Sequence, residues 1–342
     1  MVSNRWRKAG IVVTEDKNLT IGDIAEKLGV SKTTVSRAIS GKGRIGDKTR
    51  EKVLEYIEAH HYRPNVIAKG LAQSKTYNIG LAIPGDYNII ELPFFQSCML
   101  GISKVASSMD YDVLISIVTA HDISRLQRAV INRKVDGMIL TRTLLHDAPA
   151  DYLKEAGIPF VTIGSLDDDS IVQIDNDHRS ACMEMTKQLF AKGIEKIALI
   201  GGSREYVVNG NRLQGFLDAY ERSGRTADEE HIYLDVEDAE GVERIVGEAL
   251  QDGIECIVAM DDYLCGRVLT VLRHRKVNVP GQVKVVSFYD SSFLEDDIPS
   301  IRFDIEELGE MTCKTLLRMI EGEEVQTRTL LGYQLALCKI DN

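Results

Sequence analysis

Apolar positions near the start of the chain recur at the spacing of a helix. Between residues 21 and 28 they are separated by three, four and seven positions, so they share one helix face. Thr20 precedes this segment and Asp23 occupies its third position, an approximate capping box. The pattern predicts a helix that begins directly after Thr20 and ends before Gly29.

Two further short helices are expected after the first. Ser31 can cap a helix over residues 32–39, in which apolar side chains again gather on one face. A third apolar stripe follows Asp47, which we expect to cap the third helix. Three short helices with a tight glycine turn between the first two describe a helix-turn-helix domain.

Beyond residue 76 the pattern changes to short apolar runs that alternate with amphipathic stretches. This alternation is typical of an α/β domain with parallel sheets. The last three runs repeat the spacing of three earlier ones, which predicts two similar lobes with a ligand cleft beyond the carboxyl ends of their strands. The runs expected to be strands are residues 79–83, 111–115, 135–140, 159–163, 197–200, 254–260 and 283–288.

Charge is unevenly distributed along the chain. The 342 residues carry a net charge of −11, which by itself argues against nucleic acid as a partner. Residues 1–75, however, hold 15 Lys and Arg against 8 Asp and Glu, a charge of +7, and the remaining residues therefore carry −18. A basic head on an acidic body predicts a polyanion-binding module joined to a second domain.

Several classes of site are disfavoured. The six cysteines form no C-x-x-C pair and the seven histidines no H-E-x-x-H motif, so we expect neither a metal nor a cofactor. There is no nucleotide-binding glycine loop, nucleophile elbow or Ser-His-Asp set, so an enzyme is not expected. No apolar stretch suits a membrane span or a signal peptide, which predicts a cytoplasmic protein with no membrane partner.

The second helix carries the candidate DNA-reading side chains. Its outward residues are short polar or cationic. Lys and Arg can donate to guanine O6 and N7, and hydroxyls can reach phosphates or bases. A merely solvated face is the alternative, but the agreement of turn, caps and basic charge favours DNA. These outward residues are Lys32, Thr33, Ser36 and Arg37.

The head of the chain resembles the lactose-repressor (LacI/GalR) family of bacterial transcription regulators. The matching segments are Thr20–Arg37, Gly41–Ile45, Thr49–Val53 and Tyr62–Asn65. The resemblance implies that Lys32, Thr33 and Arg37 read the major groove of double-stranded operator DNA, with the serine and threonine hydroxyls mostly on phosphates. The residues implied to bind DNA are Thr20, Ser31, Lys32, Thr33, Thr34, Ser36, Arg37, Asn65, Ala68 and Leu71.

A hinge is expected after the third helix. Pro64 cannot continue that helix, and Asn65 can cap a short new one. By similarity to the family, this is the hinge helix that orders on the operator and pairs with its counterpart in a dimer. Leu71 then matches the leucine wedged between base steps, and Ala68 approaches the floor of the minor groove. Gly70 departs from the family pattern and weakens the helix by about 1 kcal/mol.

The body of the chain resembles the family's effector domain, which is shaped like periplasmic sugar-binding proteins. Arg212 suits a sugar hydroxyl pair or a carboxylate because its guanidinium donates in a bidentate manner. Phe94 or Phe95 can stack on a sugar face, and packing in the core is the alternative for one of them. The paired acids Asp261 and Asp262 are explained equally well by a binding site at a strand end and by acid–base work. Tyr289 stands where the family has an acid that often contacts ligand. The candidate effector-binding residues are Phe94, Phe95, Arg212, Asp261, Asp262 and Tyr289.

The predicted protein is a small all-α helix-turn-helix head with a hinge helix, followed by a two-lobed α/β domain like the periplasmic binding proteins. The expected parts are an N-terminal extension (1–17), the DNA-binding domain (18–63), the hinge helix and linker (64–76) and the effector-binding and dimerisation domain (77–342). We expect a homodimeric regulator, most simply a repressor on a palindromic operator, controlled by a sugar-like molecule. The alternatives are a repressor that needs a corepressor or partner protein, and a solute-binding protein. A dimer is preferred to a tetramer because no leucine heptads follow residue 337.

Overall fold

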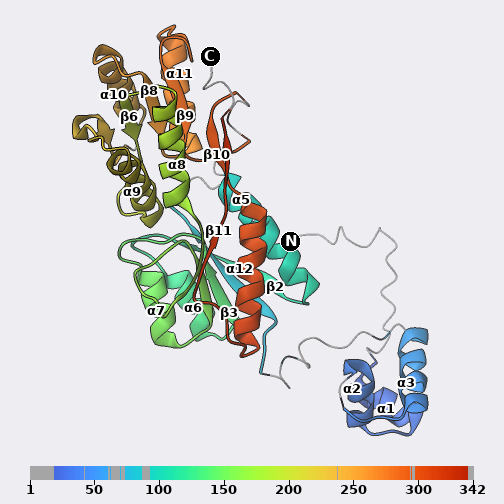
Figure 1. Ribbon diagram of the computed structural model, residues 1–342. Coiled ribbons are helices and arrows are strands. Elements are labelled where there is room, and N and C mark those ends of the chain that lie inside the picture. The colour runs from blue at the N-terminus through green and yellow to red at the C-terminus, as the bar shows by residue number, and fades with distance from the viewer. Residues whose placement is uncertain are drawn as a thin grey trace, which may run out of the picture. The chain divides into compact units, whose positions relative to one another are not determined.

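A computed structural model describes the chain in two compact units, residues 1–75 and 76–342, each considered by itself (Figure 1). The described residues are 19–41, 43–60, 62, 70, 74–86, 93–236, 238–292, 294 and 297–337. Among these residues, no helix is both long enough and apolar enough to cross a membrane.

Residues 19–60 of the small unit form three helices around an apolar core, as predicted. They are α1 (Ile21–Leu28), α2 (Lys32–Ser40) and α3 (Asp47–Ala59). The expected capping box is present, because the amide of Asp23 donates to Thr20 Oγ1 and the amide of Thr20 donates to the Asp23 carboxylate. The buried core residues are Ile24, Ala25, Val35, Ala38 and Val53.

A left-handed glycine makes the turn between α1 and α2. Gly29 has a φ of +65°, a conformation that favours glycine, and its amide donates back to the carbonyls of Ala25 and Glu26. Ser31 then caps α2, since its Oγ accepts the amide of Thr34 at 3.0 Å. The turn and the two caps fix where the second helix begins.

The expected cap of α3 is wrong. Gly46 occupies the N-cap position with an extended backbone and no side-chain bond, and Asp47 is the first helical residue. The carboxylate of Asp47 still lies in the first turn, where the positive end of the helix dipole stabilises it. The acid therefore acts through the dipole rather than as a cap.

The large unit consists of two lobes, each built on a six-stranded sheet with helices packed on it (Figure 1). The first sheet has the strand order β11-β5-β4-β3-β1-β2 and the second β12-β10-β9-β8-β6-β7. All neighbouring strands pair in parallel except β10 and β12. This confirms the two-lobed α/β architecture, and every predicted run overlaps a strand.

Each lobe has its own strands and helices. The first lobe holds β1 (Asn78–Pro84), β2 (Asp112–Val118), β3 (Gly137–Leu140), β4 (Phe160–Ile163), β5 (Val172–Asn176), β11 (Arg328–Leu331), α5 (Pro93–Ser108), α6 (Ser124–Ile131), α7 (Ala148–Ala156) and α12 (Ile305–Ile320). The second lobe holds β6 (Ile197–Ile200), β7 (Ile232–Tyr233), β8 (Cys256–Ala259), β9 (Lys284–Ser287), β10 (Ser300–Arg302), β12 (Gln334–Ala336), α8 (His178–Ala191), α9 (Val207–Arg222), α10 (Ala239–Gln251) and α11 (Asp262–His274).

Three short connections join the lobes. They run from β5 to α8 through Asp177, from β10 to α12 through Phe303, and from β11 to β12. The strands at the ends of these connections lie at or next to one edge of each sheet. They are β5 and β11 in the first sheet and β10 and β12 in the second. The connections are therefore gathered on one side, and the carboxyl ends of the strands face the space between the lobes, where such folds bind ligands.

Candidate functional site

The polar face of α2 is exposed and the opposite face is buried. Val35 and Ala38 are 0% and 3% exposed and belong to the core of the small unit. Because the core fixes this face of the helix, the polar side chains are held on the outside. The four exposed residues are those expected to face DNA: Lys32, Thr33, Ser36 and Arg37.

The loop after α2 supports the arginine of this face. Gly43 has a φ of +89°, and a Cβ at this position would lie 3.2 Å from Cδ and Nε of Arg37. Arg50 of α3 donates to the carbonyl of Gly41 at 3.3 Å, which ties the loop to the third helix. The stem of Arg37 therefore rests beside the backbone of Gly43.

The hydroxyls expected on phosphates lie at the beginnings of two helices. The hydroxyls of Ser31 and Thr34 are 2.8 Å apart at the start of α2, and Thr20 caps α1. Helix N-termini suit phosphate because their free amides and dipole attract anions. Asn65, Ala68 and Leu71 lie outside the residues that the structure describes.

In the large unit, Arg212 is the buried cation of the candidate effector site. It is 7% exposed, and its Nε has no hydrogen-bond partner among the described residues. Its guanidinium carbon lies 5.9 Å from the centroid of the Tyr289 ring. A buried donor without a partner is costly, so this Nε–H favours a ligand that accepts a hydrogen bond.

Asp175 and His178 lie beside each other near Arg212. Their Oδ1 and Nε2 atoms are 3.6 Å apart, and both side chains are buried. Burial raises the pKa of Asp175 to about 6, although Ser165 donates to its Oδ2 at 2.8 Å. Burial and the charge of Arg212 hold the pKa of His178 well below its usual range, so the imidazole is neutral.

The paired acids stand at the beginning of α11. Asp261 caps this helix, since its Oδ1 accepts the amide of Leu264 at 2.8 Å. Asp262 is buried, and its Oδ1 accepts the amide of Tyr263. Burial raises the pKa of both carboxyls, and the positive charge of Arg212 opposes that rise. The two acids and Arg212 are thus close enough to interact electrostatically.

An aromatic wall lies next to these charges. The Phe94 ring makes an edge contact with Tyr289 at 6.3 Å between centroids, and Tyr289 stacks with Phe303 at 6.4 Å. Phe95 is 8% exposed and packs edge-on against Phe94, so it is a core residue, whereas Phe94 is half-buried. Of the two phenylalanines, Phe94 is the one placed to meet a ligand.

Sequence reasoning missed four members of this cluster. Asp175 and Asn176 are the last two residues of β5, His178 is the first residue of α8, and Phe303 comes from a lobe connection. Both polar atoms of the Asn176 amide are buried without a partner among the described residues. The sequence signal was the Asp-Asn pair at a strand end. A metal site is not supported in the described part of the chain, where no three ligating side chains come together.

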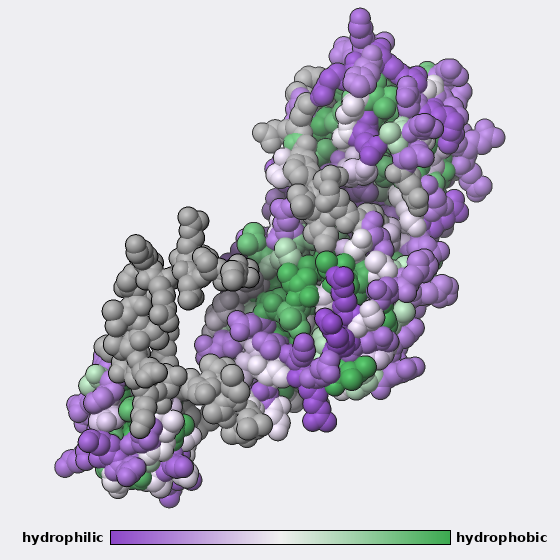
Figure 2. Space-filling model, turned by 180° about the vertical axis from the view of Figure 1, so that it is seen from behind, coloured by the Kyte–Doolittle hydropathy of each residue, from purple (hydrophilic) through white to green (hydrophobic). Residues whose placement is uncertain are grey.

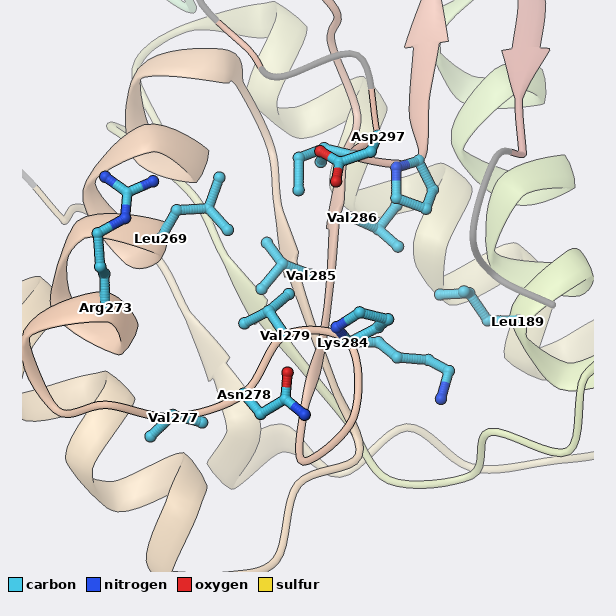
Figure 3. Close-up of a pocket in the computed structure, with 13 residues that line it drawn as sticks. Leu189, Leu269, Arg273, Val277, Asn278, Val279, Lys284, Val285, Val286 and Asp297 are labelled. Atoms are coloured by element: carbon cyan, nitrogen blue, oxygen red, sulfur yellow. The ribbon is translucent and has the colours of Figure 1, made fainter. Parts of the chain in front are cut away.

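A separate cavity of ≈ 310 Å³ lies in the second lobe between α8, α11 and β9 (Figure 3). Leu189 and Leu269 enter it from the two helices, and Val285 and Val286 from the strand. None of the candidate effector residues lines this cavity. It is therefore distinct from the cluster around Arg212.

Two family profiles together cover most of the chain. The one described as "Bacterial regulatory proteins, lacI family" matches residues 20–65. The one described as "Periplasmic binding proteins and sugar binding domain of LacI family" matches residues 76–335. The two matches coincide with the helix-turn-helix head and the two-lobed body.

Characterised relatives match over nearly the full chain. The chain is 30% identical over 329 residues to the HTH-type transcriptional regulator MalR of Streptococcus pneumoniae, covering 93% of this chain and 98% of that one. It is 27% identical over 321 residues to catabolite control protein A of Priestia megaterium, covering 91% and 95%. Both relatives are named as regulatory proteins.

Solved structures share the fold. A complex of the transcriptional regulator CelR with cellobiose has a TM-score of 0.68 at 25% identity, covering 93% of this chain and 98% of that chain. The lac repressor dimer, bound to operator and an anti-inducer, has a TM-score of 0.74 at 24% identity, covering 95% and 99%. At 24% identity, the similarity to the lac repressor shows that the two proteins share a fold.

Proposed function

The chain belongs to the lacI family of bacterial regulatory proteins, and on that premise we propose how this transcription regulator binds DNA and what controls it. A homodimer binds a palindromic operator through α2 and the segment that follows α3. A small polyhydroxyl molecule between the lobes changes operator affinity. The observation that carries the proposal is the exposed cationic face of α2, held outward by a buried core.

The DNA contacts divide into base-reading and phosphate-binding groups. Lys32, Thr33 and Arg37 enter the major groove, since their side chains stand on the exposed face of the helix. The remaining hydroxyls, on Thr20, Ser31, Thr34 and Ser36, bind phosphates. Residues 18–63 form the DNA-binding domain and residues 64–76 the hinge, in which Asn65, Ala68 and Leu71 reach the minor groove.

The effector is a sugar or sugar derivative. Arg212 Nε and the Asn176 amide are buried donors without a partner among the described residues, and the neighbouring carboxyls can accept hydrogen bonds from hydroxyls. A site with both donors and acceptors suits a neutral sugar, whose hydroxyls can donate and accept. It suits an anion less well, because the acidic side chains would repel it. Phe94 supplies an apolar face for the ring. The complex of the relative CelR with cellobiose points to the same class.

The first lobe offers a surface for the dimer. The edge strand β2 exposes Leu114, Ile115 and Ile117 to 37%, 54% and 42%. Figure 2 shows an apolar patch on the large unit. Exposed apolar patches of this kind mark interaction sites, and a two-fold axis through such a surface would match a palindromic operator.

Selection of random duplexes tests the proposal. The full-length protein is incubated with a random DNA library, bound duplexes are amplified, and enriched sequences are read. We expect enrichment of an inverted repeat whose affinity falls steeply with salt. Addition of sugars to the bound complex then reveals induction or corepression. Failure to enrich any sequence would contradict the DNA-binding assignment.

We also propose that the protein lies in the cytoplasm, together with the DNA that it binds.

A further inference from the structure

The two lobes touch across the space between them through their main chains. The loop after β3 pairs with the segment before α9. The amide of Leu145 donates to the carbonyl of Glu205 at 3.0 Å, and the amide of Val207 donates to the carbonyl of Thr143 at 3.3 Å. One lobe thus supplies a donor and an acceptor to the other, in the pattern of a small antiparallel sheet.

Side chains reinforce this contact. Leu144 and Tyr206 stand opposite each other in the antiparallel bridge, and Leu144 is 8% exposed. The guanidinium carbon of Arg142 lies 5.1 Å from the centroid of the Tyr206 ring, and Arg142 pairs with Asp86 of its own lobe at 2.8 Å. We call residues 142–145 with residues 205–207 the mouth latch.

The mouth latch lies away from the lobe connections. In the first sheet, β3 is separated from the connecting strands β5 and β11 by β4. In the second sheet, β6 is separated from the connecting strands β10 and β12 by β8 and β9. Because the latch follows β3 and β6, it joins the lobes at a place separate from the connections.

We propose that the mouth latch holds the two lobes together without a bound ligand, and that it determines how readily the effector cleft opens. In the latched arrangement the Nε of Arg212 is buried without a hydrogen-bond partner among the described residues, which opposes closure. The latch supplies main-chain bonds that offset this cost. A ligand that pairs with Arg212 favours the same closed state, so ligand and latch act on one equilibrium. The regulatory consequence rests on the proposed function above.

The substitution Val207→Pro removes one bond of the latch and leaves the helix intact. Val207 is the first residue of α9, a position where proline is tolerated because its amide is not used inside the helix. Tyr206 before it has φ −86° and ψ 119°, the extended backbone that proline requires of its predecessor. The variant therefore loses the donor to Thr143 with little other change.

Ala239→Pro is the matched control. Ala239 is the exposed first residue of α10, and Asp238 before it is also extended, with φ −118° and ψ 168°. Its amide makes no bond to the first lobe among the described residues. The two variants share the same chemistry, and only one of them touches the latch.

Hydrogen exchange of the Leu145 amide is the readout, resolved by fragmentation and mass spectrometry. Leu145 lies on the lobe that neither substitution alters. We expect Val207→Pro to accelerate its exchange about twofold to tenfold, the factor for one net hydrogen bond, and Ala239→Pro to leave it unchanged. Equal exchange of Leu145 in the wild type and Val207→Pro would overturn the latch.

A reversible crosslink tests regulation. Leu144 and Tyr206 form a non-hydrogen-bonded antiparallel pair, whose Cα spacing of about 4.5 Å suits a disulfide. The variant Leu144→Cys/Tyr206→Cys is measured on the selected operator after oxidation and after reduction. The five described native cysteines are buried. We expect the two dissociation constants to differ by at least about fivefold.

Equal dissociation constants in the two redox states would show that the latch has no regulatory role. If instead the wild-type protein binds no duplex specifically, the proposed function fails. The exchange of Leu145 still reports on the latch in that event, because it is measured without DNA. The two failures are therefore distinguishable.

Discussion

The guanidinium of Arg212 faces the ring of Tyr289, with the guanidinium carbon 5.9 Å from the ring centroid. Tyr289 is 6% exposed, and burial raises the pKa of its phenol, so the ring stays neutral. Arg212 thus meets an aromatic face on one side. Its charge also opposes the raised pKa of the buried carboxyls of Asp175, Asp261 and Asp262, while its Nε has no hydrogen-bond partner among the described residues.

Replacing Arg212 should change both stability and ligand response. We expect Arg212→Met to lower the free energy of unfolding at pH 7 by about 1–3 kcal/mol, because it removes the positive charge that stabilises the buried carboxylates of Asp175, Asp261 and Asp262. The same change should abolish the thermal stabilisation by any sugar that protects the wild type. Urea unfolding and thermal-shift assays measure the two effects.

Arg222→Met on the exposed end of the same helix is the control for this prediction. It should change stability by less than about 0.5 kcal/mol and keep the ligand response. Unchanged or raised stability in Arg212→Met would show that the guanidinium does not stabilise these carboxylates.

Stability should fall with rising pH because of Asp175. Its folded pKa, about 6, is raised above its unfolded value, so the carboxyl contributes most below the unfolded pKa and the contribution is lost as pH rises to 6. The loss between about pH 4 and pH 7 should reach at most about 3 kcal/mol. Asp175→Asn should lack this component.

The measurement is the difference in free energy of unfolding between wild type and Asp175→Asn at several pH values. His178 responds in the opposite direction, since its folded pKa is lowered and stability is lost as pH falls below its unfolded pKa. Both proteins retain His178, so its direct effect largely cancels. A difference that is constant with pH would refute the raised pKa of Asp175.

The edge strand β2 should carry the dimer contact. Ile115→Asp places a charge on a side chain that is 54% exposed, so it should weaken dimerisation at least about tenfold with little effect on the fold. Ile131→Asp is the control, because Ile131 is 71% exposed at the end of α6. Analytical ultracentrifugation compares the two. Equal dimer dissociation constants for the two variants would contradict the placement of the dimer interface on β2.

Local signals made the small unit predictable. The helix faces, the Thr20 capping box and the Gly29 turn depend on residues a few positions apart, so they can be predicted from the sequence. Asp47 was assigned wrongly because an acid can either cap a helix or occupy its first turn. Backbone geometry at Gly46 decides between the two, and sequence does not contain it.

The cleft was only partly predictable, since it depends on contacts between distant segments. Arg212 and the paired acids are indicated by the family pattern, but the proximity of Asp175 and His178 to Arg212 depends on the position of β5 in the sheet, and periodicity does not reveal this strand. The pairing of Leu144 with Tyr206 has no sequence signature, because main-chain groups make most of it. Long-range main-chain contacts need the tertiary structure.

The most direct test of the central claim is the affinity of Arg37→Ala for the selected operator, measured by fluorescence anisotropy beside a scrambled duplex. Lys52→Ala removes the same charge from an exposed site on α3 and is the control. We expect Arg37→Ala to lose about 1–3 kcal/mol of specific binding, with both variants weakening equally on scrambled DNA. If Arg37→Ala and Lys52→Ala reduce operator binding by the same factor, α2 does not read the bases and the account is contradicted.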